Sequence, residues 1–153
     1  MRIRRLTTVD LPQLAEIESQ TRSPWPVAEL TDELQQGRDY VYVAESLEGD
    51  RAEIEGWYKA QVVPPEAELH KIAVLRAVRR QGIGQKLLDH LIGKLVKEGC
   101  SVLYLEVRSK NNQAVGFYRK NGFYEVGLRR GYYREPVDDA LLMQRDITQP
   151  GIS

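Results

Sequence analysis

The chain has 153 residues, which suits one compact domain of ordinary size. It is 42% hydrophobic and carries 22 basic and 22 acidic side chains, which argues against wholesale disorder and against a general nucleic-acid binder. No apolar run reaches membrane-spanning length, and the basic residues Arg2, Arg4 and Arg5 are followed by no apolar segment, so neither a membrane helix nor a signal peptide is expected. A single cysteine, Cys100, excludes an internal disulfide and a cysteine-based zinc site; we expect no metal and a cytoplasmic location.

The spacing of apolar residues predicts the elements of the first half of the chain. They are a short strand at 2–6, two helices separated by a break at 24–26, and strands at 40–44, 54–63 and 68–75. Asp10 is expected to cap the first helix, with Pro12 in its first turn, and Gly37 to end the second. A turn is expected at 47–50.

In the second half of the chain, the spacing of apolar residues changes from a strand-like to a helical period. The predicted elements are an amphipathic helix at about 82–98, a strand at 101–107, a short helix after Asn111 or Asn112, and strands at 123–128 and 140–145. Gly99 and Gly122 are expected to end the two helices. This order predicts an α/β (α+β) fold with a mixed sheet and helices on its faces. We expect a single domain over 1–148 and a loose tail at 149–153.

The sharpest local motif joins a predicted strand to the long helix: Arg79-Arg80-Gln81-Gly82-Ile83-Gly84. Its glycines permit positive φ, and the free N–H groups of the helix start favour an anion such as a pyrophosphate. A Walker A loop is excluded because Gln85-Lys86 follows Gly84, and a dinucleotide fingerprint lacks its third glycine. A solvated basic turn is the alternative. The flanking elements, and the absence of acids between Lys71 and Lys86, favour anion binding.

The loop matches at every position the Arg/Gln-x-x-Gly-x-Gly/Ala pyrophosphate loop of the GNAT (GCN5-related N-acetyltransferase) superfamily. Residues 2–147 as a whole resemble that superfamily, and within it the ribosomal-protein-alanine N-acetyltransferase (RimI-type) family. The matching segments are Pro24-Trp25-Pro26, Ile72-Ala73-Val74, Arg80-Gln81-Gly82-Ile83-Gly84, Leu105-Glu106-Val107-Arg108, Asn111, Phe117-Tyr118, Asn121-Gly122-Phe123, Arg129-Arg130-Gly131-Tyr132-Tyr133 and Asp139-Ala140-Leu141-Leu142-Met143. The Leu-Glu-Val-Arg and Arg-x-Tyr-Tyr segments point to acetylation of protein N-terminal α-amines.

The resemblance implies the GNAT fold, with a mostly antiparallel sheet of about six or seven strands and helices on both faces. It implies acetyl-CoA as co-substrate and direct transfer to a protein or peptide N-terminus, such as the N-terminal alanine of ribosomal protein S18 or a broader set. We expect a monomer or weak homodimer, with no nucleic-acid or membrane partner. Transfer to a small-molecule amine or a lysine side chain, and a CoA-binding module without catalysis, stay open as alternatives. Cys100 has no neighbouring His and is read as a small buried residue rather than a nucleophile.

Glu106 is the candidate general base. It shares one face of its strand with Val102 and Tyr104, and a carboxylate near the end of an apolar strand is desolvated, which suits a base. From chemistry alone, an ion pair with Arg108 or another arginine is the preferred reading. The resemblance reverses this preference, because the glutamate of Leu-Glu-Val-Arg is that family's proposed base, acting on the incoming ammonium directly or through water.

Tyr118 is the candidate general acid. The family pattern places a tyrosine hydroxyl beside the CoA sulfur, where it would protonate the leaving thiolate. A thiolate with a pKa near ~8.5 gains from a nearby donor as it forms. Aromatic packing on a helix that also carries Val115 is the alternative, and only the resemblance favours the acid.

The resemblance also assigns contacts with acetyl-CoA. Ile72, Ala73 and Val74 would offer backbone groups to the pantetheine arm, although these residues equally suit an ordinary buried strand. The pyrophosphate contacts fall on Arg79, Arg80, Gln81, Gly82, Ile83, Gly84 and Gln85. Asn111 would cap the following helix, bind the pantetheine, or do both.

Five residues are candidates for the acceptor side: Trp25, Glu68, His70, Tyr132 and Tyr133. Glu68 and His70 are reserve bases or substrate contacts, although a lone strand histidine is more often structural. The three aromatic residues would line a cleft around a peptide N-terminus, with core and hairpin packing as the alternative. The residues on either side of the two tyrosines depart from the pattern of the ribosomal enzymes.

The zero net charge conceals an asymmetry along the chain. Residues 1–70 hold 7 basic and 14 acidic side chains, whereas residues 71–153 hold 15 basic and 8 acidic ones. The basic half contains the candidate pyrophosphate loop and suits an anionic cofactor. The acidic half contains the first helices, where a cationic N-terminus would be attracted.

Overall fold

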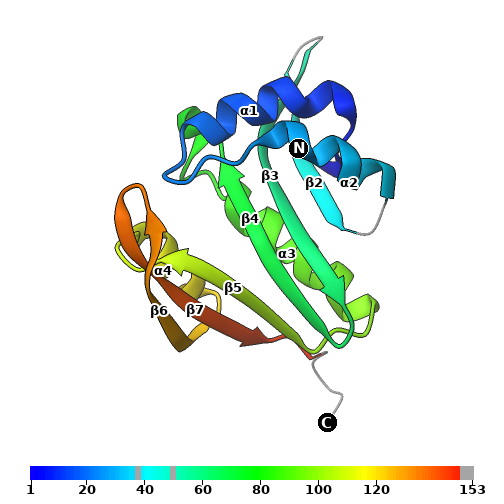
Figure 1. Cartoon of the computed structure of the whole chain (residues 1–153). Coiled ribbons are helices and arrows are strands. Elements are labelled where there is room, and N and C mark those ends of the chain that lie inside the picture. Colours follow the sequence, from blue (N-terminus) through cyan, green and yellow to red (C-terminus); the bar gives the residue numbers. More distant parts are fainter. Residues whose placement is uncertain (37–38, 49–50, 149–153) are drawn as a thin grey trace. The chain divides into compact units, whose positions relative to one another are not determined.

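The computed structural model describes residues 1–36, 39–48 and 51–148 (Figure 1). Its elements are β1 (Arg2–Arg5), α1 (Leu11–Ser19), α2 (Leu30–Gln36), β2 (Tyr40–Glu48), β3 (Arg51–Val63), β4 (Glu66–Val74), α3 (Ile83–Lys97), β5 (Val102–Arg108), α4 (Asn112–Lys120), β6 (Tyr124–Arg134) and β7 (Val137–Asp146). Short 3-10 helices precede α1 and α2 and follow β4. The predicted order of helices and strands is confirmed.

The strands are hydrogen-bonded in the order β1-β2-β3-β4-β5-β7-β6. The β1·β2, β2·β3, β5·β7 and β6·β7 pairs are antiparallel, and the β4·β5 pair is parallel. The expected mixed, mostly antiparallel sheet is therefore confirmed, with seven strands. Figure 1 shows α1 and α2 on one side of the β2–β3–β4 sheet and α3 on the other.

The chain divides into two compact units. Unit one comprises Met1–Val62 and His70–Lys94, and unit two comprises Val63–Leu69 and Leu95–Ser153. The single domain expected over 1–148 stays a prediction. The expected tail at 149–153 and the helix stop at Gly37 lie outside the described residues.

Each unit is held together by the faces that the apolar spacing selects. In unit one, Leu14 and Ile17 of α1 are buried in a cluster with Trp57 of β3. In unit two, Leu103 of β5 and Met143 of β7 are fully buried. Burying one such side chain contributes about 1.5–3 kcal/mol, so these faces rather than helix propensity hold the elements in place.

Three local expectations need correction. Residues 47–48, expected to be part of a turn, belong to strand β2. The last two strands are longer than predicted: β6 extends to Arg134 and β7 begins at Val137. Most of β6 is exposed, and its charged residues hide the alternation. Asp10 does stand directly before α1, but its side chain makes no capping hydrogen bond to that helix.

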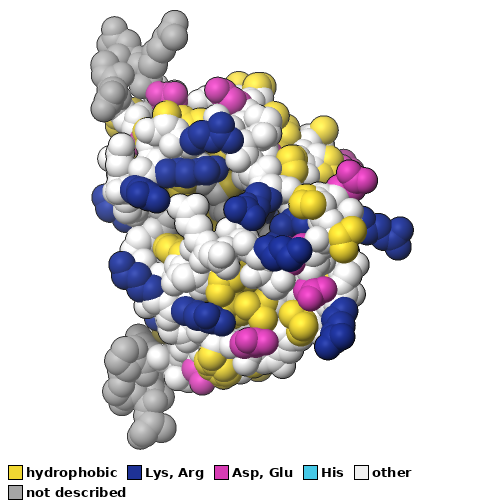
Figure 2. Space-filling view, turned by 90° about the vertical axis from the view of Figure 1, so that its left-hand side faces the viewer, with side chains coloured by type: hydrophobic (Ala, Val, Ile, Leu, Met, Phe, Trp, Pro, Cys, Tyr) yellow, Lys and Arg dark blue, Asp and Glu magenta, His cyan; other side chains and the backbone are white. Residues whose placement is uncertain are grey.

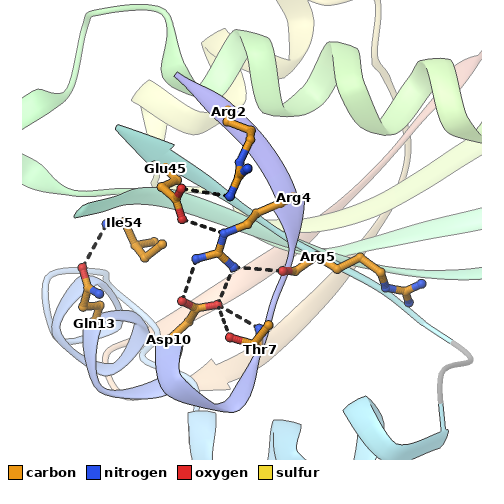
Figure 3. Close-up of polar contacts among 8 residues, drawn as sticks. All are labelled: Arg2, Arg4, Arg5, Thr7, Asp10, Gln13, Glu45 and Ile54. Carbon is orange, nitrogen blue, oxygen red and sulfur yellow. Dashed lines mark hydrogen bonds and ion pairs between the residues drawn. The ribbon is translucent and has the colours of Figure 1, made fainter. Parts of the chain in front are cut away.

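The Asp10 carboxylate instead belongs to a network with Arg4 and Glu45 (Figure 3). It accepts hydrogen bonds from Arg4 Nη1 and Nη2 at 2.8 and 2.9 Å, and from the backbone N–H and hydroxyl of Thr7 at 2.8 and 3.1 Å. Glu45 on β2 accepts from Arg4 Nε at 2.6 Å and from Arg2 Nη2 at 3.2 Å. One guanidinium thus neutralises two buried carboxylates that come from different elements.

Replacing Arg4 by methionine is expected to lower the free energy of unfolding by about 3–5 kcal/mol, because two buried carboxylates lose the guanidinium that they share. Burial pushes the pKa of Asp10 up, but the bonds from Arg4 and Thr7 outweigh it and hold that pKa below its usual range. The stabilisation is therefore present above the unfolded pKa of about 3.9 and is lost as the pH falls through the lower folded value. Urea unfolding from pH 7 to pH 3 measures both effects.

The matched control is Arg22→Met, which makes the same change at an exposed position of unit one. It should shift stability by less than about 0.5 kcal/mol. An Arg4→Met variant as stable as this control at pH 7, or a difference from wild type that does not narrow in acid, would contradict the assigned role.

Candidate functional site

The glycine loop stands between β4 and α3 in unit one. Arg80 has a φ of 65° and is the one non-glycine residue with positive φ in the part of the chain that the structure describes. Gly82 has a φ of 83°, and a Cβ added there would meet no atom within 4 Å. A left-handed backbone followed by the unpaired N–H groups of a helix start presents donors to an anion.

The side chains of the loop divide into anchored and exposed ones. Arg79 Nε donates to the carbonyl oxygen of Val74 at 3.1 Å, which ties the loop to the end of β4. Ile83 is buried, whereas Arg80, Gln81 and Gly82 are exposed. Of these three exposed residues, Arg80 is the one with a charged side chain, so its guanidinium is available to an anion. Gln85 donates to the Asp89 carboxylate at 2.9 Å.

The strand that precedes the loop, β4, is paired with β5 over only part of its length. Its pairing with β5 runs from Glu66 to Leu69, and His70–Val74 belongs to unit one. Ala73 is buried in the core of unit one, and Ile72 and Val74 are half-buried. The ordinary packing role of these residues is present, and a role toward pantetheine stays a prediction.

Glu106 lies on the less buried face of β5, as predicted from the alternation along that strand. Its side chain is 23% exposed, and Oε1 lies 3.7 Å from Nη1 of Arg129. An ion pair with an arginine, kept as the alternative, thus exists, and Arg129 is the partner. Arg129 is 57% exposed, and such a pair contributes at most about 1 kcal/mol, so it leaves the carboxylate available to a substrate.

Tyr118 lies on α4 with its ring edge-on to Phe117 and Phe123, both at 5.5 Å between centroids. The residue is 8% exposed, and none of the described residues forms a hydrogen bond with its hydroxyl. Burial, and to a smaller extent the charge on an ionised Tyr133, raise the pKa of Tyr118 well above the ordinary value of a tyrosine. The predicted packing is present, together with a buried hydroxyl donor that has no hydrogen-bond partner among the described residues.

Asn111 caps α4 as predicted, because its Oδ1 accepts a hydrogen bond from the Ala114 N–H at 3.2 Å. A further contact of Asn111 with pantetheine stays a prediction. Cys100 is buried, and burial followed by the nearby Glu98 raises the pKa of its thiol. A thiol held protonated in this way fits the expectation that Cys100 is no nucleophile.

Two of the acceptor-side candidates meet in unit one. His70 Nδ1 lies 3.1 Å from the ammonium of Lys59, and the His70 and Trp25 rings are 6.3 Å apart. Trp25 also packs edge-on against the buried Trp57 at 6.2 Å. The packing alternative for Trp25 is therefore present. Glu68 lies in unit two, opposite Tyr104 in the pairing of β4 with β5.

The other two candidates, Tyr132 and Tyr133, lie on the β6–β7 hairpin. Their rings are edge-on at 5.2 Å, and Tyr132 is 50% exposed. Burial, and then the charge of Glu106, raise the pKa of the Tyr133 hydroxyl. Arg129 lies 5.6 Å from the centre of the Tyr132 ring. The structure therefore brings both tyrosines into the surroundings of Glu106.

Sequence reasoning missed the buried residues that hold these candidates in place. Glu18 is almost fully buried and accepts from the Trp25 backbone N–H, from Trp57 Nε1 and from Lys71 Nζ, all at 3.0 Å. Its position four residues after Leu14, on the apolar stripe of α1, is the one indication of burial that the sequence contains. Asp138, buried in unit two, was also missed, and Arg108 was named only in a motif and as a possible partner of Glu106, without its burial.

The surface and the ionisable groups set limits on the chemistry. Figure 2 shows more Lys and Arg than Asp and Glu side chains on the face that it draws, with the acidic side chains scattered among the basic ones. Within residues 1–36, 39–48 and 51–148, no three His, Cys, Asp or Glu side chains are grouped so as to hold a metal ion. No helix in these ranges is long and apolar enough to cross a membrane.

Comparison with known proteins identifies the family. The model of the Acetyltransferase (GNAT) family matches residues 11–123. A ribosomal protein bS18-alanine N-acetyltransferase of Escherichia coli is 38% identical over 149 residues, which cover 95% of this chain and 97% of that protein. The N-alpha-acetyltransferase RimI of Mycobacterium tuberculosis is 39% identical over 149 residues, 95% of this chain and 92% of that protein.

Solved structures agree with this result. The crystal structure of the Escherichia coli ribosomal-protein-S18-alanine N-acetyltransferase superposes with a TM-score of 0.84 at 35% identity, covering 98% of this chain and 96% of that one. Chaetomium thermophilum Naa20 has the same fold, with a TM-score of 0.81 at 18% identity. The superposition covers 99% of this chain and 93% of the Naa20 chain. The chain belongs to the acetyltransferase (GNAT) family and is an N-acetyltransferase.

Proposed function

We propose that this chain transfers an acetyl group from acetyl-CoA to the N-terminal α-amine of a protein, with the N-terminal alanine of ribosomal protein S18 as the first candidate. The observation that carries this proposal is the pair of reacting groups in unit two. Glu106 offers a carboxylate that is neither fully buried nor firmly paired, and Tyr118 offers a buried hydroxyl with no described hydrogen-bond partner. Acetyl transfer from a thioester to an ammonium uses one base and one acid.

The residues present fit acetyl-CoA. The left-handed backbone at Arg80 and Gly82, followed by the start of α3, suits a pyrophosphate, and the exposed Arg80 head suits its charge. Ile72, Ala73, Val74 and Asn111 are proposed to contact the pantetheine arm. The orphaned Tyr118 hydroxyl suits the sulfur end. When bound, acetyl-CoA supplies the acetyl group as an activated thioester.

The protein groups then have separate tasks. Glu106 accepts the proton that the acceptor ammonium must lose before its nitrogen can attack, directly or through one water. Tyr118, protonated at neutral pH, donates a hydrogen bond to the sulfur as the thiolate forms and then passes its proton to it. Solvent then takes the proton from Glu106 and returns one to Tyr118. Both tasks are acid–base steps, and Cys100 takes no part because its thiol is buried and protonated.

Two points favour a protein α-amine as the acceptor. An α-amine has a pKa near 8, against about 10.4 for lysine, so a carboxylate base deprotonates it far more readily. The name of the Escherichia coli relative specifies an alanine of ribosomal protein bS18, and that of the Mycobacterium tuberculosis relative specifies N-alpha acetylation. Tyr132 and Tyr133, close to Glu106, are proposed to contact the peptide, with Trp25, Glu68 and His70 as secondary candidates. We propose the cytoplasm, where ribosomal proteins are made, as its location.

The experiment is an acceptor panel with acetyl-CoA and product analysis by mass spectrometry. The N-terminal peptide of ribosomal protein S18 should gain one acetyl group, located on the α-amine. The matched control is the same peptide with a blocked N-terminus and its lysines free, which should gain none. The proposed acceptor would be refuted if polyamines, free amino acids or lysine are acetylated while the peptide with a free N-terminus is not. Binding of acetyl-CoA without any turnover would refute it as well.

A further inference from the structure

The turn of the β6–β7 hairpin is held by a buried arginine of the neighbouring segment. Arg108, the last residue of β5, is 7% exposed. Its Nη1 donates to the carbonyl oxygen of Pro136 at 2.7 Å, and its Nη2 donates to that of Glu135 at 3.0 Å. Both acceptors lie in the turn between β6 and β7. The two nitrogens of one guanidinium therefore fix two successive carbonyl groups.

The residues that follow Arg108 reinforce this attachment. The Ser109 hydroxyl donates to Asp138 Oδ1 at 2.7 Å, and the Lys110 backbone N–H donates to Asp138 Oδ2 at 3.2 Å. Asp138 is buried at the start of β7. The segment 108–110 thus holds both the turn and the start of β7, only two residues beyond Glu106.

The same guanidinium also contacts the aromatic face of the hairpin. Its Cζ lies 4.3 Å from the centre of the Tyr133 ring, which is a close cation–π contact. Between Arg129 and Tyr133 the register with β7 shifts, and Gly131, at a φ of 61°, donates its N–H to Asp139 Oδ1 at 2.8 Å. This irregularity leaves Tyr132 half exposed beside the anchored Tyr133.

We propose that Arg108 is a positioning residue: it holds the hairpin so that Tyr132 and Tyr133 present one fixed surface to the acceptor next to Glu106. This inference rests on the proposed function. Lysine cannot replace Arg108, because a single ammonium cannot bond two carbonyl groups with the fixed geometry of a planar fork while stacking on a ring. Loosening the hairpin would weaken acceptor binding and leave the use of acetyl-CoA unaffected.

The test compares Arg108→Lys with the matched control Arg119→Lys, an exposed position on α4 of the same unit. Arg108→Lys is expected to raise the acceptor KM about tenfold, with the KM for acetyl-CoA and kcat within about twofold. Hydrogen exchange should accelerate in the peptide spanning 129–139 and stay unchanged at 102–107. Arg119→Lys should match wild type in every readout.

The outcomes separate this inference from the proposed function. Unchanged exchange at 129–139, or a fall in kcat with both KM values constant, overturns the positioning role. Faster exchange throughout unit two with a lower Tm also overturns it, because Arg108 would then be a general stabiliser. If wild type fails to acetylate any N-terminal peptide, the proposed function fails. The exchange measurement still decides whether Arg108 anchors the hairpin.

Discussion

Replacing Glu106 by glutamine is expected to lower kcat by about 10²- to 10⁴-fold at neutral pH, the usual contribution of a positioned general base. Glutamine keeps the size of the side chain and loses its ability to accept the ammonium proton. The deficit should narrow as the pH rises through about 8, because the acceptor α-amine then loses its proton to solvent. Steady-state rates with saturating acetyl-CoA, measured from pH 6 to pH 9, test both statements.

Arg129→Gln is the matched control for this prediction. It removes the 3.7 Å ion pair and leaves the carboxylate in place. If Glu106 serves only as the partner of Arg129, both variants should show the same small decrease in the free energy of unfolding, and both should stay active. If Glu106 is the base, Arg129→Gln should keep kcat within a few-fold of wild type. Full activity of Glu106→Gln across the pH range would exclude the base assignment.

The fold was largely predictable because its elements differ in hydrophobic period. The helix expected at about 82–98 is α3 (Ile83–Lys97), whose buried leucines recur at helical spacing. Strand β5 was found from its alternation for the same reason. The β6–β7 hairpin was found only in part, because most of β6 is exposed and its arginines follow no burial pattern.

The candidate site was predictable only where its residues form local motifs. The glycine loop, the Leu-Glu-Val-Arg segment and Phe117-Tyr118 can each be recognised from a short stretch of consecutive residues. The buried residues that hold the site in place bind partners that are distant in the sequence. Arg108 donates to a residue 28 positions away, and Glu18 accepts from a tryptophan 39 positions away. Such partners are fixed by tertiary packing, so a charged residue in an apolar stripe signals burial without naming what it binds.

Replacing Tyr118 by phenylalanine is expected to separate activity from stability. Loss of the proton donor should lower kcat by about 10²- to 10⁴-fold, whereas the ring contacts with Phe117 and Phe123 are retained. A buried hydroxyl with no described partner carries a desolvation cost, so its removal should leave Tm equal to or above that of wild type. Kinetics and thermal unfolding of one preparation measure both.

The control for this variant is Tyr124→Phe, which removes a tyrosine hydroxyl from an exposed site on β6, where it accepts from Gln144 at 2.7 Å. Its kcat should equal that of wild type. A Tyr118→Phe variant with wild-type kcat would reduce Tyr118 to a packing residue. A variant that loses activity and stability together would show that the hydroxyl has a structural partner. Only inactivity with an unchanged or higher Tm fits a hydroxyl kept unpaired for the leaving thiolate, because selection for stability alone would favour phenylalanine at this position.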